Sequence, residues 1–135
     1  MDEINKKIIR ELENNSRQTN IQLAKKLKVS EGTIRQRITK LSKNKIINFT
    51  IETSTLYGFS AMVLIKTDPS INTDIIAKKL KNIESVKNIF ETTGNFDIII
   101  KLNTDSALEF NGIIEKIRTI NGIDSTESLV ILKKS

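Results

Sequence analysis

The chain has 135 residues, of which 38% are hydrophobic and 28% charged, the composition of an ordinary globular protein. It contains neither Cys nor His, which excludes disulfides, thiolate metal sites and hydrolases built on a Ser–His or Cys–His pair. The longest apolar stretch, residues 61–65, is far shorter than the roughly 20 residues that span a bilayer. With no secretory signal at the N-terminus, we expect a cytoplasmic protein that needs no cofactor or metal.

The positive charge is concentrated at the N-terminal end. Residues 1–54 hold 12 basic and 6 acidic side chains, whereas residues 55–135 hold 10 of each, so the whole net charge of +6 lies before residue 55. Between residues 15 and 47 nine basic side chains accompany a single acid, Glu31. Such asymmetry indicates a part that binds a polyanion and a part with another task, although charge alone is equally consistent with a solvated basic face.

Three amphipathic helices are predicted in the first fifty residues. The first follows the N-cap Asp2, and the other two span about residues 20–28 and 31–44, with Ser30 as the N-cap of the third. The last two helices meet across a turn of about three residues, with Ala24 at the point of close approach. This is the helix-turn-helix arrangement, in which the second helix of the pair enters the major groove of DNA.

The third helix carries an apolar stripe and an opposite polar face. At about 100° per residue, Ile34, Ile38 and Leu41 point inward, with Arg35 and Arg37 at the borders of the stripe. Gln and Arg side chains on the outward face suit base edges, whereas Lys and Thr suit phosphates. We therefore predict DNA contacts from Asn20, Lys25, Ser30, Gly32, Thr33, Arg35, Gln36, Arg37, Thr39, Lys40, Lys43 and Lys45.

The second half of the chain alternates strands and helices. Residues 47–53 first alternate apolar and polar, which predicts a strand that forms a wing or reaches a partner subunit. The order that follows is β-α-β-β-α-β, with Leu129–Ile131 expected in the sheet core. Strands are expected near residues 61–65, 86–92, 96–102 and 123–132, and helices near 72–82 and 106–120.

The predicted fold class is α+β, with an N-terminal winged helix-turn-helix and a C-terminal ferredoxin-like βαββαβ sandwich. Two helices would cover one face of a four-stranded antiparallel sheet and leave the other face bare. Because a bare apolar face is normally hidden by a partner, we expect a homo-oligomer.

The whole pattern resembles the leucine-responsive/asparagine-type family, also called feast/famine regulators. The resemblance runs nearly end to end and rests on residues 2–9, 23–27, 29–41, 94–97 and 129–132. It implies dimers formed by pairing the sheets, often assembled into octamers, and transcriptional control tuned by a free amino acid bound between dimers. It also implies a helix-turn-helix domain over 1–46, a strand linker over 47–56 and an effector-binding and oligomerisation domain over 57–135.

The resemblance also implies an effector site at one end of the second domain. In that site Asp97 would meet the ammonium group of the amino acid, and backbone amides around Gly94 and Asn95 would meet its carboxylate. The simpler alternatives are that Gly94 and Asn95 only form a hairpin turn and that Asp97 only bonds backbone. The implied residues are Glu91, Gly94, Asn95, Phe96, Asp97, Ala107, Ser128, Leu129, Val130 and Ile131.

Three residues depart from the family's usual pattern. Lys45 stands where Gly is usual, so Asn44 is expected to supply the helix C-cap. Asn95 stands where Asp is common, and Glu91 stands where an apolar side chain often lies. These two changes alter the charge of the implied pocket and leave the identity of the effector open.

The predicted function is that of a sequence-specific DNA-binding transcriptional regulator, modulated by a small amino acid at a dimer–dimer interface. The alternative is a nucleoid-architectural protein that binds double-stranded DNA with low sequence specificity and no effector. Siroheme decarboxylases look similar but rely on His, which this chain lacks, so we expect no enzyme activity. A stand-alone amino-acid sensor is disfavoured by the basic N-terminal half.

Overall fold

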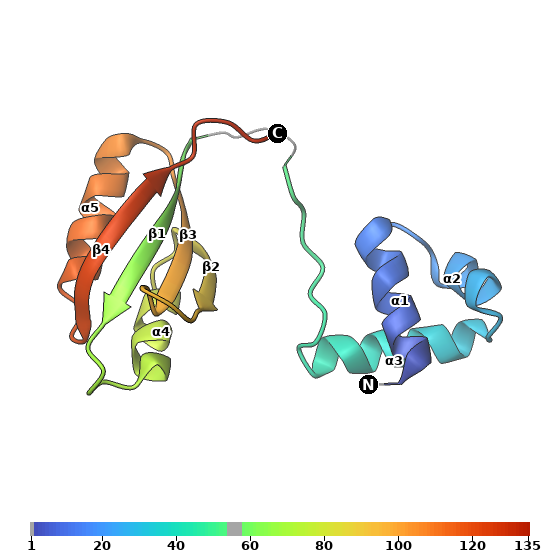
Figure 1. Ribbon diagram of the computed structural model, residues 1–135. Helices are drawn as coiled ribbons and strands as arrows, with labels where there is room; N and C mark the ends of the chain where they lie inside the picture. The colour runs from blue at the N-terminus through green and yellow to red at the C-terminus, as the bar shows by residue number, and fades with distance from the viewer. Residues whose placement is uncertain (1, 54–57) are drawn as a thin grey trace. The chain divides into compact units, whose positions relative to one another are not determined.

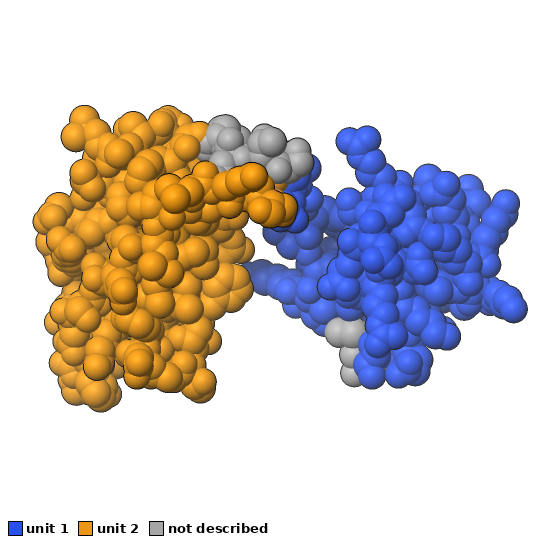
Figure 2. All heavy atoms as spheres, turned by 45° about the horizontal axis from the view of Figure 1, so that its top comes forward, with its two compact units in different colours: residues 1–52 blue, residues 53–135 orange. Residues whose placement is uncertain are grey.

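A computed structural model describes residues 2–53 and 58–135 of the chain (Figure 1). The chain divides into two compact units, Met1–Glu52 and Thr53–Ser135 (Figure 2). We call them the head and the sheet unit. The boundary between them falls inside the segment 47–56 that the sequence marks as a linker.

The head consists of three helices that enclose a small apolar core. Each helix begins at a side-chain cap, because Asp2, Thr19 and Ser30 accept hydrogen bonds from backbone N–H groups that the first turn leaves unpaired. The helices are α1 (Glu3–Asn14), α2 (Asn20–Leu27) and α3 (Glu31–Lys43). The buried core residues are Ile8, Leu12, Leu23, Ala24, Ile34 and Leu41. The predicted inward face of α3 is confirmed at Ile34 and Leu41, and Ile38 is half-buried.

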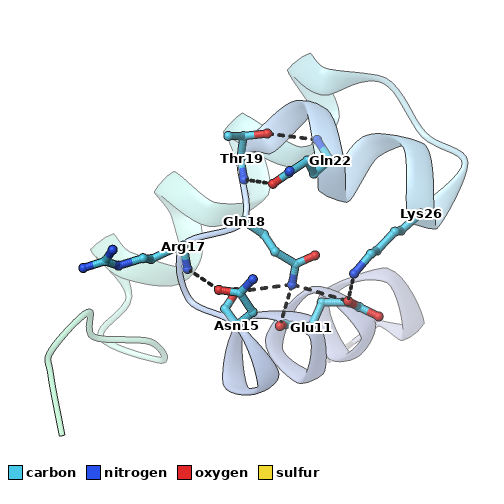
Figure 3. Close-up of polar contacts among 7 residues, drawn as sticks. All are labelled: Glu11, Asn15, Arg17, Gln18, Thr19, Gln22 and Lys26. Carbon is cyan, nitrogen blue, oxygen red and sulfur yellow. Dashed lines mark hydrogen bonds and ion pairs between the residues drawn. The ribbon is translucent and has the colours of Figure 1, made fainter. Parts of the chain in front are cut away.

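A polar network connects α1 to the following loop and to α2 (Figure 3). Glu11 on α1 pairs with Lys26 on α2 at 3.0 Å, and the Gln18 side-chain amide donates to the Glu11 carbonyl oxygen at 2.8 Å. Thr19 and Gln22 complete a capping box by exchanging hydrogen bonds between side chain and backbone. The loop between the two helices is therefore held by side-chain contacts at both of its ends.

The strand predicted from residue 47 is wrong for residues 47–53, which lie in no helix or strand. The rest of that prediction, residues 54–56, falls outside the described residues. Alternating side chains do not make a strand unless a neighbour pairs with the backbone N–H and C=O groups. In the described single chain no strand is hydrogen-bonded alongside this segment, so it forms no wing.

The sheet unit has the predicted βαββαβ order (Figure 1). Its four strands are antiparallel and lie in the spatial order β2-β3-β1-β4, so the two central strands are β1 and β3. The elements are β1 (Phe59–Thr67), α4 (Thr73–Lys81), β2 (Val86–Glu91), β3 (Ile98–Thr104), α5 (Ala107–Arg118) and β4 (Ile123–Val130).

Helices α4 and α5 cover one face of this sheet. Side chains of β1 and β3 alternate between buried and partly exposed, so every second residue faces the helices. The resulting core is rich in isoleucine and is larger than that of the head. Its fully buried members include Val63, Ile65, Ile98, Ile100 and Leu102.

The opposite face of the sheet, which we call the open face, has no helix over it and carries a group of apolar side chains, with Lys101 and Glu127 in the same rows. The strand register places Met62 beside Leu129, and Leu64 beside Ile99, with Phe90 next along the same row. Phe90 and Leu129 are 51% and 53% exposed. The expectation that residues 129–131 lie in the core is therefore wrong for the single chain, because β4 is an edge strand and Leu129 lies on the uncovered face.

Candidate nucleic-acid interface and effector site

The turn between α2 and α3 has the predicted length and close packing. Lys28, the C-cap of α2, adopts the left-handed conformation at φ 57°, and the next N–H, that of Val29, donates to the Ala24 carbonyl. Ser30 then caps α3, and its hydroxyl lies 2.8 Å from that of Thr33. Ala24 is only 8% exposed, as expected where two helices approach closely. The two helices and this turn form a helix-turn-helix.

The residues predicted to contact DNA gather on the outer side of α3 and at its ends, with two on α2. Four of them are half-buried, namely Asn20, Gly32, Thr33 and Arg37. The other eight are exposed to solvent: Lys25, Ser30, Arg35, Gln36, Thr39, Lys40, Lys43 and Lys45.

The two arginines of α3 differ in their surroundings. Arg35 pairs with Glu31 one turn earlier on the same helix, at 2.7 Å, and its side chain is 63% exposed. Arg37 pairs instead with Asp2 at the start of α1 and donates to the side-chain oxygen of Asn5 at 3.1 Å. The Arg37 side chain is 29% exposed, so it is turned toward α1 rather than away from the head.

Asp2 has two contacts that stabilise its ionised form. Its Oδ1 accepts a hydrogen bond from the backbone N–H of Asn5 at 2.8 Å, and its Oδ2 faces Arg37. The backbone hydrogen bond and, after it, the Arg37 guanidinium hold the pKa of Asp2 below its ordinary value. Sequence reasoning identified Asp2 only as a helix cap, since nothing near it in sequence indicates a partner 35 residues away.

The end of α3 also departs from the family's usual residue. Asn44 is the C-cap, as expected, but Lys45 takes the left-handed conformation, at φ 57°, that Gly normally occupies. The Lys45 N–H donates to Ser42 and the Ile46 N–H donates to Leu41, the two bonds of a Schellman motif. A lysine therefore occupies a position in which its Cβ is unfavourable.

The predicted effector residues lie in two groups at opposite ends of the sheet. The turn between β2 and β3 carries Glu91 and residues 94–97, and the backbone N–H of Asp97 donates to Ile65 at the end of β1. Residues 129–131 and Ala107 lie toward the other end, since Val130 pairs with Ala61 near the start of β1, and Ser128 pairs with Val63 in the middle of that strand. Ala61 and Ile65 are about 13 Å apart along an extended strand. One chain therefore does not bring the two groups together.

Asp97 is already engaged within its own chain. Its Oδ2 accepts hydrogen bonds from the backbone N–H of Thr67 at 2.8 Å and from the Thr67 hydroxyl at 3.1 Å. These bonds join the β2–β3 turn to the end of β1. The simpler interpretation, in which Asp97 bonds backbone, describes this oxygen. Gly94 in the same turn has φ 103° and nothing near its missing Cβ.

The described residues form neither a metal site nor a membrane span. Among residues 2–53 and 58–135, no group of three or more acidic side chains is arranged to hold a metal ion. Within the same ranges, no helix has the length and apolar character that a membrane span requires.

Comparison with known proteins places both units in one family. Residues 1–42 match the model of the AsnC-type helix-turn-helix domain, and residues 60–135 match that of the Lrp/AsnC ligand-binding domain. The chain is 37% identical over 134 residues to the HTH-type transcriptional regulator LysM of Sulfurisphaera tokodaii, covering 98% of this chain and 96% of that protein.

Structural comparison agrees with the sequence match. The structure of AsnC from E. coli superposes with a TM-score of 0.69 at 28% identity, covering 99% of this chain and 93% of that one.

The chain is also 28% identical over 124 residues to homocitrate synthase of Saccharolobus solfataricus, covering 80% of this chain but 27% of that enzyme.

Proposed function

The chain belongs to the Lrp/AsnC family of helix-turn-helix transcriptional regulators, and from this premise we propose that it binds operator DNA as a homodimer through α3. The observation that carries the proposal is the capped α2–turn–α3 unit, whose outward face holds Gln36, Thr39 and Lys40 in solvent while the opposite face is buried. The net charge of +6 in residues 1–54 supports binding to a polyanion.

The homodimer is proposed from the open face of the sheet. Its apolar side chains lie in neighbouring rows on four strands, and the two with the largest exposure, Phe90 and Leu129, would lose water contact against a second copy. A two-fold dimer presents two copies of α3, and such dimers read half-sites about one helical turn apart. One small head has few base contacts, so pairing two heads increases the specificity of binding.

The effector is proposed to be a free amino acid held between chains. Because the two groups of predicted residues lie at opposite ends of one sheet, a site that uses both requires two chains. One chain would supply the turn with Gly94 and Asn95, and another would supply the end of β4 and the start of α5. The residues 57–135 would thus serve both assembly and effector binding.

We also propose that the chain acts without catalysis. The similarity to homocitrate synthase covers only 27% of that enzyme, whereas the matches over residues 1–42 and 60–135 are to the helix-turn-helix and ligand-binding domains of the regulator family.

Selection of bound fragments from random DNA tests the main proposal. Purified full-length protein should enrich a palindromic sequence with two half-sites. Binding of all fragments without enrichment would contradict the proposal and favour a nucleoid-compacting protein. If the protein binds no duplex even at low salt, the proposal that it binds DNA is contradicted.

Sedimentation of a charged variant tests the dimer. Phe90→Asp places a carboxylate on the open face and should convert the dimer to a monomer at micromolar concentration, since an unpaired charge in an interface is strongly unfavourable. Ile75→Asp is the matched control, because Ile75 is 52% exposed on α4, which covers the other face. Equal masses for the two variants would contradict the assignment of the open face.

Calorimetric titration with a panel of amino acids tests the effector site. Asn95→Pro removes a backbone N–H that would meet the effector carboxylate and should weaken any heat of binding that the unmodified protein shows. Thr93→Ala, at an exposed position of the same turn, should retain it. Asp97→Ala is a poorer probe, since it also removes the bonds to Thr67. Unchanged binding by the Asn95 variant would place the effector elsewhere.

A further inference from the structure

We propose that Arg37 is a positioning residue, which holds α3 against the start of α1 through Asp2 and Asn5, and that operator discrimination depends on this contact. Arg35, by contrast, is the arginine of α3 that meets DNA. The inference rests on the proposed function, in which α3 enters the major groove. It assigns a role in sequence reading to Asp2, which lies outside the helix-turn-helix.

The contacts around Arg37 join two helices that are distant in sequence. Its Nη1 lies between the carboxylate of Asp2 and the side-chain oxygen of Asn5. Asp2 simultaneously caps α1 through the Asn5 N–H, so its side chain has a fixed orientation. A cap, a carboxylate and a guanidinium thus form one connected cluster, which we call the N-terminal clamp.

Arg35 has none of these long-range contacts. Its described ion-pair partner is Glu31, four residues earlier on the same helix, so that pair moves with α3 and holds it to nothing else. Exposed pairs of this kind are weak and readily exchanged for a phosphate or a guanine edge. The side chain of Arg35 is more than twice as exposed as that of Arg37, 63% against 29%.

The clamp adds to the apolar core of the head a contact with a preferred geometry between the start of α1 and α3. Burial of Ile8 and Ile34 holds α1 and α3 together, but burial depends on area and not on angle. A charge-assisted hydrogen bond has a preferred geometry and restricts how far α3 can turn about its own axis. Binding sites need their side chains placed within about 0.5 Å and 10–20°, so a small rotation of α3 weakens base readout first.

The variant Asp2→Asn separates this proposal from simple electrostatics. Asn caps helices as well as Asp does, and its oxygen is needed for the Asn5 N–H, so its amide N–H group would face the Arg37 guanidinium. The variant also removes a negative charge from a DNA-binding head. General electrostatics therefore predicts tighter binding, whereas loss of the clamp predicts weaker binding to the operator.

The experiment measures affinity for two duplexes, one carrying the sequence that the unmodified full-length protein enriches and one of random sequence. For Asp2→Asn we expect about a tenfold loss on the enriched duplex, the order of one lost base contact, with binding to the random duplex unchanged or tighter. Arg37→Ala should give the same loss, and the double variant should lose no more than either single one.

The salt dependence of binding separates the two arginines. Arg35→Ala should reduce the slope of log affinity against log salt by about one, because one fewer counterion is released. Arg37→Ala should leave that slope unchanged while operator discrimination falls. Circular dichroism at the assay temperature checks that the variants fold, and Asp2→Ser, which caps without carrying a charge, repeats the Asp2→Asn test if Arg37→Ala does not fold.

The results distinguish this inference from the proposed function. If the unmodified protein enriches no sequence, the proposed function fails. If it does enrich one, tighter operator binding by Asp2→Asn, or equal slope changes for Arg35→Ala and Arg37→Ala, overturns the positioning role alone.

Discussion

The head and the sheet unit are held together in different ways. In the head, ion pairs join separate helices, Glu11 to Lys26 and Asp2 to Arg37, around six buried apolar residues. In the sheet unit twelve buried apolar residues form the core, and the ion pair between Glu115 and Arg118 lies within a single helix. Charged contacts therefore supplement apolar packing between the helices of the head, whereas apolar packing and strand pairing join the elements of the sheet unit.

A core truncation in the sheet unit should have the largest effect. Ile100→Ala removes a side chain that is fully buried between the helices and the sheet, and should cost about 2–5 kcal/mol of unfolding free energy. Denaturant unfolding measures the loss of unfolding free energy, and amide hydrogen exchange shows which helices and strands are destabilised. Exchange should accelerate in β1 and β3 and stay slow in α1–α3. Equal acceleration in the head would contradict the separation into two units.

A glycine substitution tests how tightly the strands are packed. Gly58 has φ 72°, and a Cβ there would lie 2.4 Å from the backbone oxygen of Thr104. Gly58→Ala should therefore cost about 2–4 kcal/mol, combining conformational strain with a steric clash. Gly94→Ala is the matched control, since Gly94 also has a positive φ but open space around it, and should cost only about 1 kcal/mol. Similar thermal shifts for both variants would argue against the clash.

A substitution at the end of α3 should stabilise the head. Lys45→Gly relieves the left-handed strain of Lys45 and should add about 0.5–1 kcal/mol to the unfolding free energy. Lys45→Asn should add less, since Asn tolerates this conformation without being free of strain. Thermal unfolding of both variants checks the order. A Gly variant less stable than the parent would show that the Lys45 side chain has a stabilising contact that outweighs the strain.

Acidification should affect the head through its two cross-helix carboxylates. The Lys26 side chain holds the pKa of Glu11 below its ordinary 4.5, and the Asn5 N–H and Arg37 hold that of Asp2 below 3.8. A carboxyl group whose pKa is lower in the folded state stabilises the fold above its unfolded pKa, and that contribution is lost as the pH falls through the folded value. The head should thus lose stability as the pH falls below about 4.5.

Unfolding of Glu11→Gln at neutral pH and at pH 3 checks this expectation. The variant should be less stable than the parent at neutral pH and closer to it in acid, where the parent's Glu11 is also protonated. A constant difference between the two proteins at both pH values would contradict the role of the ionised carboxylate.

Apart from the strand predicted after residue 47, the sequence alone determined the order of the helices and strands, because their signals are local. Side-chain caps at Asp2, Thr19 and Ser30 and the spacing of apolar residues act within one or two turns, and the predicted inward face of α3 is the buried one. The β-α-β-β-α-β order follows in the same way from alternation along short segments. These features can be predicted from the sequence because each depends on residues only a few positions apart.

The tertiary structure decided which residues are partners across the chain. The link between Asp2 and Arg37 and the bonds from Thr67 to Asp97 join residues at least 30 positions apart. The separation of the two effector groups depends on the pairing of β4 with β1. The wrong prediction of a strand after residue 47 has the same cause, because a β-strand forms only where a neighbouring strand pairs with its backbone N–H and C=O groups. Sequence periodicity predicts on which face of a helix or strand a side chain lies. Only the tertiary structure shows which residues that face contacts.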